Sequence, residues 1–328
     1  GIGEVSYTSD NIIIATGSET KWLPISGKDN PRVVDSTGLL NLNTLPERLC
    51  ISGAGVIGMA FASVFRRFGS EVTVIEYLKE YLPALDSDIA KRLRKYLEKQ
   101  GITFKMKTAV ENIADLDADV VLMATGRKPR TEGLGLEAIG VDLAPNGAIP
   151  VNDDYELITK PKVFAIGDVN GRQMLAHAAE AQAIYVVNKI VNRKSVNRKW
   201  LDIMPAAIFT EPEAACVGPT EDQLKEQGIP YVCKKSFWRA NGKALAMNAT
   251  EGMLKLFVSP PESGGVPEGR GGLKNGLILG CHAYGAHSAA IVQEVSVQMC
   301  KHTTLHELAD MVHIHPTLSE ILKNAAEN

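Results

Sequence analysis

The sequence lacks any pair of cysteines that lie close together. None of its five cysteines is within ten residues of another, and they occupy positions Cys50, Cys216, Cys233, Cys281 and Cys300. This spacing excludes a CxxC redox motif and a zinc site built from neighbouring cysteines. An odd number of scattered cysteines is typical of buried, reduced thiols, which predicts a reducing compartment.

Long apolar runs and an excess of charge of one sign are also absent. No apolar run reaches the roughly 18 residues that cross a bilayer, so we expect no membrane-spanning helix. The 35 basic and 38 acidic residues give a net charge of −3, without the basic excess of proteins that bind nucleic acid. Hydrophobic residues make up 45% of the 328 positions, which is enough for packed cores in two or three domains.

Strands alternate with helices in the first part of the chain. One helix is predicted at residues 59–68, and a second begins after the capping residue Asp86 and ends near Gly101. Short apolar strands are predicted at residues 49–52, 71–75, 102–105 and 119–124. Strands that alternate with helices predict right-handed βαβ units on a parallel sheet.

A strand that ends in Ala-Thr-Gly occurs twice. Residues 14–17 and 123–126 share this pattern, and each follows an apolar run that is typical of a buried strand. A third strand, at residues 163–166, ends in Gly-Asp, and an alanine-rich helix is predicted at residues 177–191. Residues 192–199 are polar and have the character of a linker.

The composition changes from Pro205 onward. The pairs Thr220 with Gln223 and Thr304 with Glu307 have the spacing of capping boxes at helix starts. Strands are predicted at residues 208–210, 231–234, 253–258 and 277–281, and helices at 220–227, 288–301 and 304–312. Strands followed by helices predict an α+β domain. Residues 260–276 are rich in glycine and proline, which indicates a flexible surface loop.

The first predicted strand and helix of the alternating region are joined by a GxGxxG turn, Gly53-Ala54-Gly55-Val56-Ile57-Gly58. In a dinucleotide-binding turn, Gly53 allows the sharp bend, Gly55 lets the backbone approach a pyrophosphate, and Gly58 lets helix and strand pack closely. The free amides and the positive dipole end of the following helix suit phosphate groups. We therefore expect this turn, including Val56 and Ile57, to bind a dinucleotide.

Glu76 ends the second strand of this unit, at the distance where such sites place an acidic residue. A carboxylate there accepts hydrogen bonds from a ribose 2′-hydroxyl and repels a 2′-phosphate, which favours NAD over NADP. The alternative is that the glycines serve only a tight turn and that Glu76 only ends a strand.

Taken together, these motifs resemble those of the flavoprotein disulfide reductases. Four motifs carry the resemblance in the family's order: Ala15-Thr16-Gly17, the GxGxxG turn with Glu76, Ala124-Thr125-Gly126-Arg127 and Ala165-Ile166-Gly167-Asp168. The most specific single element is similar to that of the dihydrolipoamide dehydrogenase branch: His313-Ile314-His315-Pro316-Thr317-Leu318-Ser319-Glu320. The resemblance covers nearly the whole chain.

The resemblance implies FAD as a second cofactor. Asp168, after Gly167, is expected to bind the ribitol and phosphate region of FAD, and backbone amides around Ala178 are expected to face the flavin ring. Gly17 and Gly126, which close the two Ala-Thr-Gly turns, are also expected to be cofactor-binding residues. The alternative for Asp168 is a plain turn residue after a strand, because Gly-Asp is a common turn pair.

The resemblance also implies that His315 and Glu320 are an acid–base pair. An imidazole exchanges protons with a dithiol near neutral pH, and a carboxylate orients it. The alternative is that Thr317 and Glu320 form one more capping box and that His315 is a surface residue. For His313 a packed or solvated histidine is the expected interpretation. No histidine has the spacing of a metal ligand, so we expect no metal.

The sequence departs from the family in three places. The family's CxxxxC disulfide and its first GxGxxG turn lie upstream of the equivalent of Asn11, and neither occurs here. We therefore expect Gly1 to mark a cut through the FAD domain and the chain alone to be inactive. Ala60 stands where relatives commonly have a glutamate, which puts efficient hydride transfer in question. Residues 110–119 are shorter than the β-meander of relatives.

These observations predict an α/β protein with a Rossmann-type parallel-sheet NAD domain and a partial FAD domain, followed by an α+β interface domain. The expected divisions are residues 1–34 and 131–204 for FAD, 35–130 for NAD and 205–328 for the interface. The resemblance implies a homodimeric dihydrolipoyl dehydrogenase that serves the lipoyl domain of a 2-oxo-acid dehydrogenase complex, in a bacterial cytoplasm or a mitochondrial matrix. An NAD-binding and dimerisation fragment without redox activity, or another disulfide reductase, are the alternatives.

Overall fold

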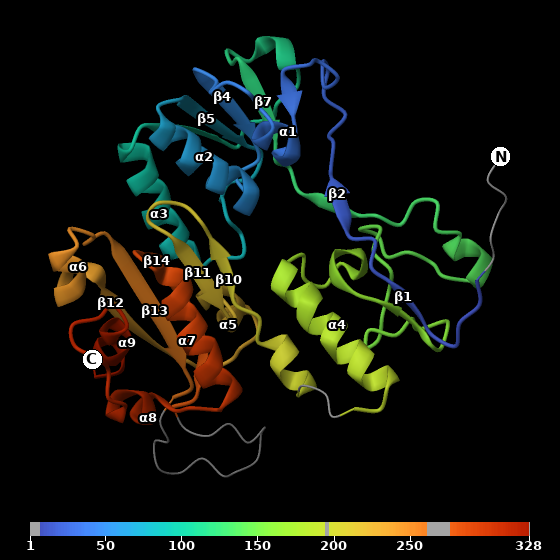
Figure 1. The fold of residues 1–328 in the computed structure, drawn as a ribbon. Helices are drawn as coiled ribbons and strands as arrows, with labels where there is room; N and C mark the ends of the chain where they lie inside the picture. Colours follow the sequence, from blue (N-terminus) through green and yellow to red (C-terminus); the bar gives the residue numbers. More distant parts are fainter. Residues whose placement is uncertain (1–6, 194–196, 261–275, 328) are drawn as a thin grey trace. The chain divides into compact units, whose positions relative to one another are not determined.

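The computed structural model describes residues 7–193, 197–260 and 276–327. The chain divides into two compact units, Gly1–Lys21 with Gly126–Asp202, and Trp22–Thr125 with Ile203–Asn328. Each unit is made of two segments that are far apart in the sequence (Figure 1). Among the described residues, no helix is both long and apolar enough to span a bilayer.

The larger unit contains a five-stranded parallel sheet with the order β3-β7-β4-β5-β6. Its strands are β3 (Val33–Val34), β4 (Arg48–Ser52), β5 (Glu71–Glu76), β6 (Ile102–Met106) and β7 (Val120–Met123). Three helices connect them: α1 (Ser36–Leu40), α2 (Val56–Phe68) and α3 (Ser87–Lys99). Because successive right-handed crossovers run in the same direction, these helices lie on one face of the sheet (Figure 1).

The two faces of this sheet are covered differently. On the helical face, Leu49, Ile51, Val72 and Val74 pack against apolar residues of α2 and α3. On the other face, the segment between β6 and β7 provides Ile113, Ala118 and other apolar residues, and it contains a single 3-10 turn at Ile113–Asp115. The short segment at residues 110–119 therefore covers the sheet without strands of its own.

The same unit contains a five-stranded antiparallel sheet with the order β10-β11-β14-β13-β12. Its strands are β10 (Ala206–Ile208), β11 (Ala214–Val217), β12 (Val232–Phe237), β13 (Gly252–Val258) and β14 (Ile278–Gly285). The helices are α5 (Glu221–Glu226), α6 (Gly242–Ala246), α7 (Ser288–Cys300), α8 (Leu305–Asp310) and α9 (Glu320–Glu327). Helix α7 lies against this sheet in Figure 1.

Strand β13, which lies between β14 and β12, is buried along its whole length because both faces of the antiparallel sheet are covered. Leu254 and Leu256 pack toward α7 and α9. Met253 and Tyr284 of the opposite face join the apolar cluster that also contains the helices of the parallel sheet. The two sheets of this unit therefore share one continuous core.

A buried carboxylate, Asp86, caps two helices at the contact between the two sheets. Its Oδ1 accepts hydrogen bonds from the Asp88 amide of α3 at 3.1 Å and from Lys255 Nζ at 2.7 Å. Its Oδ2 accepts from the amide of Glu221, the first residue of α5, at 3.2 Å. Lys255 Nζ also lies 2.6 Å from the Glu221 carboxylate, and this hydrogen bond lowers the pKa of Glu221 to about 2.

His282 completes this buried polar contact. Its Nδ1 accepts a hydrogen bond from the Asp86 amide at 3.0 Å, and its Nε2 lies 3.1 Å from the Pro219 carbonyl. Because an amide only donates and a carbonyl only accepts, the ring is neutral and its proton is on Nε2. Burial lowers the pKa of His282 to about 4, which agrees with a neutral ring. We call Asp86, Glu221, Lys255 and His282 the buried joint.

The smaller unit is built from short elements. Strand β1 (Ile12–Ile14) pairs in parallel with β9 (Val163–Ala165), and β2 (Ser18–Thr20) pairs antiparallel with β8 (Arg127–Pro129). Helix α4 (Ala176–Ile190) packs on a core to which β9 contributes Phe164 and Ala165.

The predicted fold class is confirmed, with a parallel α/β sheet followed by an α+β domain. Both capping boxes, at Thr220 and Thr304, are present with reciprocal hydrogen bonds. The strand predicted at residues 208–210 lies instead at 206–208, because Thr210 and Pro212 enter a loop. Helices α1, α6 and α9 were not predicted. The first two have only five residues each, and the start of α9 was considered only as the capping-box alternative at Thr317 and Glu320. Most of the loop predicted at residues 260–276 lies outside the described residues.

Candidate active site

The three glycines of the GxGxxG turn have different surroundings. Gly53 has a φ of +107°, and a Cβ there would lie 2.4 Å from the carbonyl oxygen of Ala124. A Cβ at Gly58 would lie 2.1 Å from the carbonyl oxygen of Gly53. Around Gly55, in contrast, no atom lies within 4 Å of a Cβ position. Gly53 and Gly58 are therefore required by the turn itself, whereas Gly55 leaves open space.

The N-terminus of α2 has no side-chain cap. Its N-cap residue is Gly55, and no acidic residue occurs in the first turn, which contains Val56 and Ile57. The first amides of a helix need an external acceptor, and a phosphate is a common one. The open space at Gly55 and the uncapped helix end are the features that a pyrophosphate needs.

Glu76 lies beside this turn. Its Oε2 accepts a hydrogen bond from the Ala54 amide at 2.6 Å, and its Oε1 accepts one from the Leu78 amide at 2.8 Å. The carboxylate is therefore an acceptor held directly at the glycine turn. Ala60 lies further along α2, is partly buried and brings no polar group to the turn.

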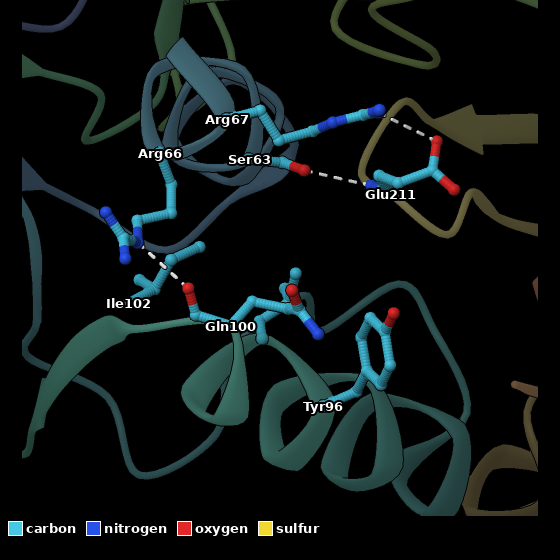
Figure 2. Close-up of a pocket in the computed structure, with 8 residues that line it drawn as sticks. Ser63, Arg66, Arg67, Tyr96, Gln100, Ile102 and Glu211 are labelled. Atoms are coloured by element: carbon cyan, nitrogen blue, oxygen red, sulfur yellow. Dashed lines mark hydrogen bonds and ion pairs between the residues drawn. The ribbon is translucent and has the colours of Figure 1, made fainter. Parts of the chain in front are cut away.

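A cavity of about 390 Å³ lies near the other end of α2, and its lining contains the charged residues Arg66, Arg67 and Glu211. Figure 2 shows that these side chains are already paired: Arg66 Nε donates to the Gln100 carbonyl at 2.8 Å, and Arg67 lies 3.0 Å from the Glu211 carboxylate. Ser63 Oγ accepts from the Glu211 amide at 2.9 Å. Arg67 and Glu211 join α2 to the loop after β10, and Arg66 joins α2 to the end of α3, so all three charged side chains of the lining are already used within the fold.

In the smaller unit, three polar side chains form a chain of hydrogen bonds. Ser18 Oγ donates to Asp168 Oδ2 at 2.5 Å and accepts from Arg127 Nε at 2.7 Å. Ser18 follows the first Ala-Thr-Gly turn and Arg127 follows the second, so both turns are linked to the Gly-Asp strand end. Asp168 is therefore more than a turn residue, because its carboxylate is fixed by a partner from a distant part of the sequence.

The glycines of these turns and the start of α4 give backbone groups to the same unit. Gly17 and Gly126 have φ values of +74° and +108°, with no atom within 4 Å of a Cβ position. Helix α4 starts after Leu175 without a side-chain cap. Ala178 lies in its first turn with a fully buried side chain, and Gln182 Oε1 accepts from the Gly167 amide at 2.8 Å.

The structure brings His315 and Glu320 together. His315 Nδ1 lies 2.9 Å from Glu320 Oε1, and the imidazole is largely exposed. Since a carboxylate only accepts, Nδ1 carries the proton, and in the neutral ring Nε2 is left as an available base. The Thr317 amide, followed by His315, lowers the pKa of Glu320 below its usual value, so this residue stays ionised.

The alternative interpretation, in which Glu320 and Thr317 form a capping box, is partly realised in the same arrangement. Glu320 Oε2 accepts from the Thr317 amide at 2.8 Å, as the glutamate of a capping box does. The Thr317 hydroxyl, however, donates to the Ile314 carbonyl at 2.7 Å instead of capping the helix. Glu320 thus uses one oxygen for the backbone and the other for His315.

Sequence reasoning missed several polar contacts. It did not connect Ser18 with Asp168, because 150 positions separate them. It considered His282 only as a metal ligand, and it gave a packed histidine as one of two interpretations of His313. Both side chains are buried and contact polar groups within the fold. Among the described residues, no group of three or more His, Cys, Asp or Glu side chains is arranged to hold a metal ion.

Together, these features define an α/β protein that has a GxGxxG turn of the kind found in dinucleotide-binding sites, with an antiparallel domain that presents an exposed histidine–carboxylate pair. The sequence profile of the pyridine nucleotide-disulphide oxidoreductases matches residues 3–183. The profile of the dimerisation domain of that family matches residues 204–266 and 272–326. The chain therefore belongs to the pyridine nucleotide-disulphide oxidoreductase family.

Individual relatives agree with this assignment. The chain is 36% identical to the mitochondrial dihydrolipoyl dehydrogenase of Pisum sativum, over 96% of this chain and 64% of that protein. It is equally similar to the leghemoglobin reductase of Glycine max, over 96% of this chain and 61% of that protein. The HOCl-induced flavoprotein disulfide reductase RclA from Escherichia coli superposes with a TM-score of 0.85 at 30% identity, covering 97% of this chain and 73% of that chain. This chain thus spans less than two thirds of the length of these two plant relatives.

Proposed function

We propose that this chain is the nucleotide-binding and interface part of a dihydrolipoyl dehydrogenase that uses NAD. The observation that carries the proposal is the Glu76 carboxylate, held 2.6 Å from the Ala54 amide at the glycine turn. A carboxylate at this point selects a free ribose hydroxyl over a phosphorylated one. The names of the relatives support the dihydrolipoyl substrate, since those of Pisum sativum and Pseudomonas putida are both called dihydrolipoyl dehydrogenases.

The residues present fit the two expected cofactors. For NAD, the open space at Gly55 and the uncapped α2 N-terminus suit the pyrophosphate, and Glu76 suits the ribose. For FAD, the fixed Asp168 carboxylate and the uncapped α4 N-terminus offer an acceptor and free amides. When bound, FAD relays an electron pair and NAD⁺ accepts a hydride.

His315 and Glu320 supply the acid–base function in this proposal. The neutral imidazole accepts a proton from a dithiol at Nε2, while the Glu320 carboxylate holds the Nδ1 proton and favours the cation that results. The exposure of the imidazole supports a role toward a group that is brought to it from outside the chain. The sequence contains no CxxxxC pair, so in this proposal the residues of this chain supply the acid–base group and not the disulfide of the exchange.

The interface domain supports a homodimer in which His315 serves the partner's disulfide site. Its support is the match of residues 204–266 and 272–326 to the dimerisation-domain profile. The substrate partner in this proposal is the lipoyl domain of a 2-oxo-acid dehydrogenase complex. Relatives from both mitochondria and a bacterium support either a mitochondrial matrix or a bacterial cytoplasm as the location.

The proposal is tested by reversing the charge at Glu76. In Glu76→Arg, the ribose acceptor is lost and a partner for a 2′-phosphate is created, so the ratio of NADH to NADPH affinity should fall at least about 10-fold. The matched control is Glu71→Arg, which makes the same change at the other end of β5 and should leave the ratio unchanged. Titration calorimetry with both nucleotides measures the ratio. An unchanged ratio in Glu76→Arg contradicts the assignment of the ribose site.

A further inference from the structure

Residues 311–315, which we call the His315 segment, run along helix α7. Gln298 Nε2 lies 3.6 Å from Met311 Sδ, and Glu294 Oε1 lies 3.5 Å from His313 Nε2. Gln298 and Glu294 are four residues apart and therefore lie on one side of the helix. Glu294 lies one helical turn before Gln298, and its partner His313 lies two residues after Met311, the partner of Gln298. The segment and the helix therefore run antiparallel.

The side chains of this segment alternate between solvent and protein. Val312 is 97% exposed and Ile314 is 79% exposed, and the His315 side chain is also 79% exposed. The His313 side chain, in contrast, is only 6% exposed. Within residues 312–315, His313 is therefore the only side chain that packs into the protein. The apolar residues on either side of it bury little surface and add little to the attachment of the segment.

The hydrogen bonds of His313 determine where its proton lies. His313 Nδ1 is 3.1 Å from the Met311 carbonyl, which only accepts, so Nδ1 carries a proton. Among the described residues, the buried Nε2 has no hydrogen-bond partner. The charged group that it faces is the Glu294 carboxylate, whose Oε1 lies 3.5 Å away. With Nδ1 used by the Met311 carbonyl, Nε2 is the ring nitrogen that faces Glu294, and the two side chains form an ion pair when the ring carries both protons.

We propose that Glu294 and His313 are a positioning pair that holds the His315 segment on helix α7 and thereby keeps His315 beside Glu320. The importance of this pair for catalysis rests on the proposed function, whereas the pair itself does not. His315 and Glu320 belong to different parts of the C-terminal region, the exposed segment and helix α9. After His315, Asn241 Nδ2 and Glu320 Oε2 hold the backbone of Thr317, at 3.0 Å and 2.8 Å. Before His315, within residues 312–315, His313 is the one buried side-chain anchor, so the 2.9 Å contact depends on it at this end of the segment.

The tautomer of neutral His315 reports this positioning directly. Beside Glu320 the neutral ring carries its proton on Nδ1, and away from Glu320 the alternative Nε2 proton becomes available. Long-range proton–nitrogen NMR of the ¹⁵N-labelled chain distinguishes the two forms for each histidine. In Glu294→Gln and in His313→Gln, the ratio of the Nδ1–H to the Nε2–H form of His315 should fall at least about threefold.

The chain provides a matched control. His306 Nε2 lies 3.5 Å from Asp310 Oδ2, the same distance as in the His313 contact, but both of these side chains are exposed. Asp310→Asn removes a carboxylate next to the segment without touching its buried anchor. It should therefore leave the tautomer ratio of His315 unchanged.

Urea unfolding of the same variants separates positioning from general stabilisation. Glu294 is partly exposed, so Glu294→Gln should leave the unfolding midpoint close to that of the unchanged chain. A lower midpoint with an unchanged tautomer ratio would show a merely structural pair and would overturn the proposal. An equal loss of the ratio in Asp310→Asn would overturn it as well. NADH titration of the same samples tests the proposed function separately, because the tautomer ratio does not depend on nucleotide binding.

Discussion

At the scale of single residues, the glycine turn separates a structural requirement from a functional one. Gly55 has φ −79° and ψ −174°, a conformation that alanine adopts without strain, and nothing lies near its Cβ position. Gly58 has no such freedom, because a Cβ would lie 2.1 Å from a backbone oxygen. The two glycines of one motif should therefore respond differently to the same substitution.

The prediction is that Gly55→Ala keeps the stability of the chain and loses NADH affinity by about 10-fold or more, since the methyl group fills the space for the pyrophosphate. Gly58→Ala should lower the free energy of unfolding by about 1–3 kcal/mol, because the backbone must shift. Urea unfolding and NADH titration of both variants provide the check. Equal stability losses in the two variants would contradict this distinction.

The catalytic candidates show what a sequence gives at this scale and what it does not. His315, Glu320 and Glu76 could be predicted because they lie in local strings with fixed spacing. The link of Asp168 to Ser18 could not, because it depends on the pairing of strands far apart in the sequence. A packed His313 was one of two interpretations given from the sequence, but its contact with Glu294 could not be predicted, because only the position of α7 brings the two side chains together.

At the scale of elements, the buried joint connects helix α3 with strand β13. Lys255 is fully buried and lies between the Asp86 and Glu221 carboxylates. Lys255→Met leaves these two charges without their partner and should lower the free energy of unfolding by about 3–5 kcal/mol.

The matched control is Lys235→Met, directly opposite on β12, where an exposed lysine lies 3.7 Å from Asp88. This control should cost at most about 1 kcal/mol, and urea unfolding compares the two. Similar losses would contradict the role of the joint.

The joint also predicts a dependence of stability on pH. Burial lowers the pKa of His282 to about 4 from its usual 6.5, so the unfolded chain binds a proton that the folded chain does not. The stability that the neutral His282 contributes is therefore complete above pH 6.5. It is lost as the pH drops toward 4, by about 3 kcal/mol in total.

His282→Gln isolates this effect, because an amide keeps an acceptor for Asp86 and a donor for Pro219 without titrating. The difference in unfolding free energy between the unchanged chain and this variant should shrink or change sign between pH 6.5 and 4. Urea unfolding at several pH values measures it. A difference that stays constant over this range would show that His282 is not held neutral by the fold.

The elements themselves followed from the sequence to different degrees. The parallel sheet and helices α2 and α3 could be predicted, because apolar periodicity, a glycine turn and the Asp86 cap agree there. Helix α6 could not, because its five residues begin with Gly242 and are held by the Asn241 side chain. The contact between the two sheets was also unpredictable, since a buried lysine in a strand leaves no pattern that distinguishes it from an exposed one.

At the scale of the whole molecule, the parallel sheet and the antiparallel sheet form one unit with a shared core and a buried joint. The nucleotide turn and the His315–Glu320 pair therefore belong to the same compact body. In the proposed enzyme, this arrangement keeps the NAD site in a fixed relation to the acid–base group that serves the partner subunit.

The central claim is that this body is built to bind NAD, and calorimetric titration of the unchanged chain with NADH and NADPH tests it most directly. We predict that NADH binds and that NADPH binds at least about 10-fold more weakly, because the Glu76 carboxylate opposes a 2′-phosphate. No binding of NADH, or affinity for NADPH equal to that for NADH, would contradict the account.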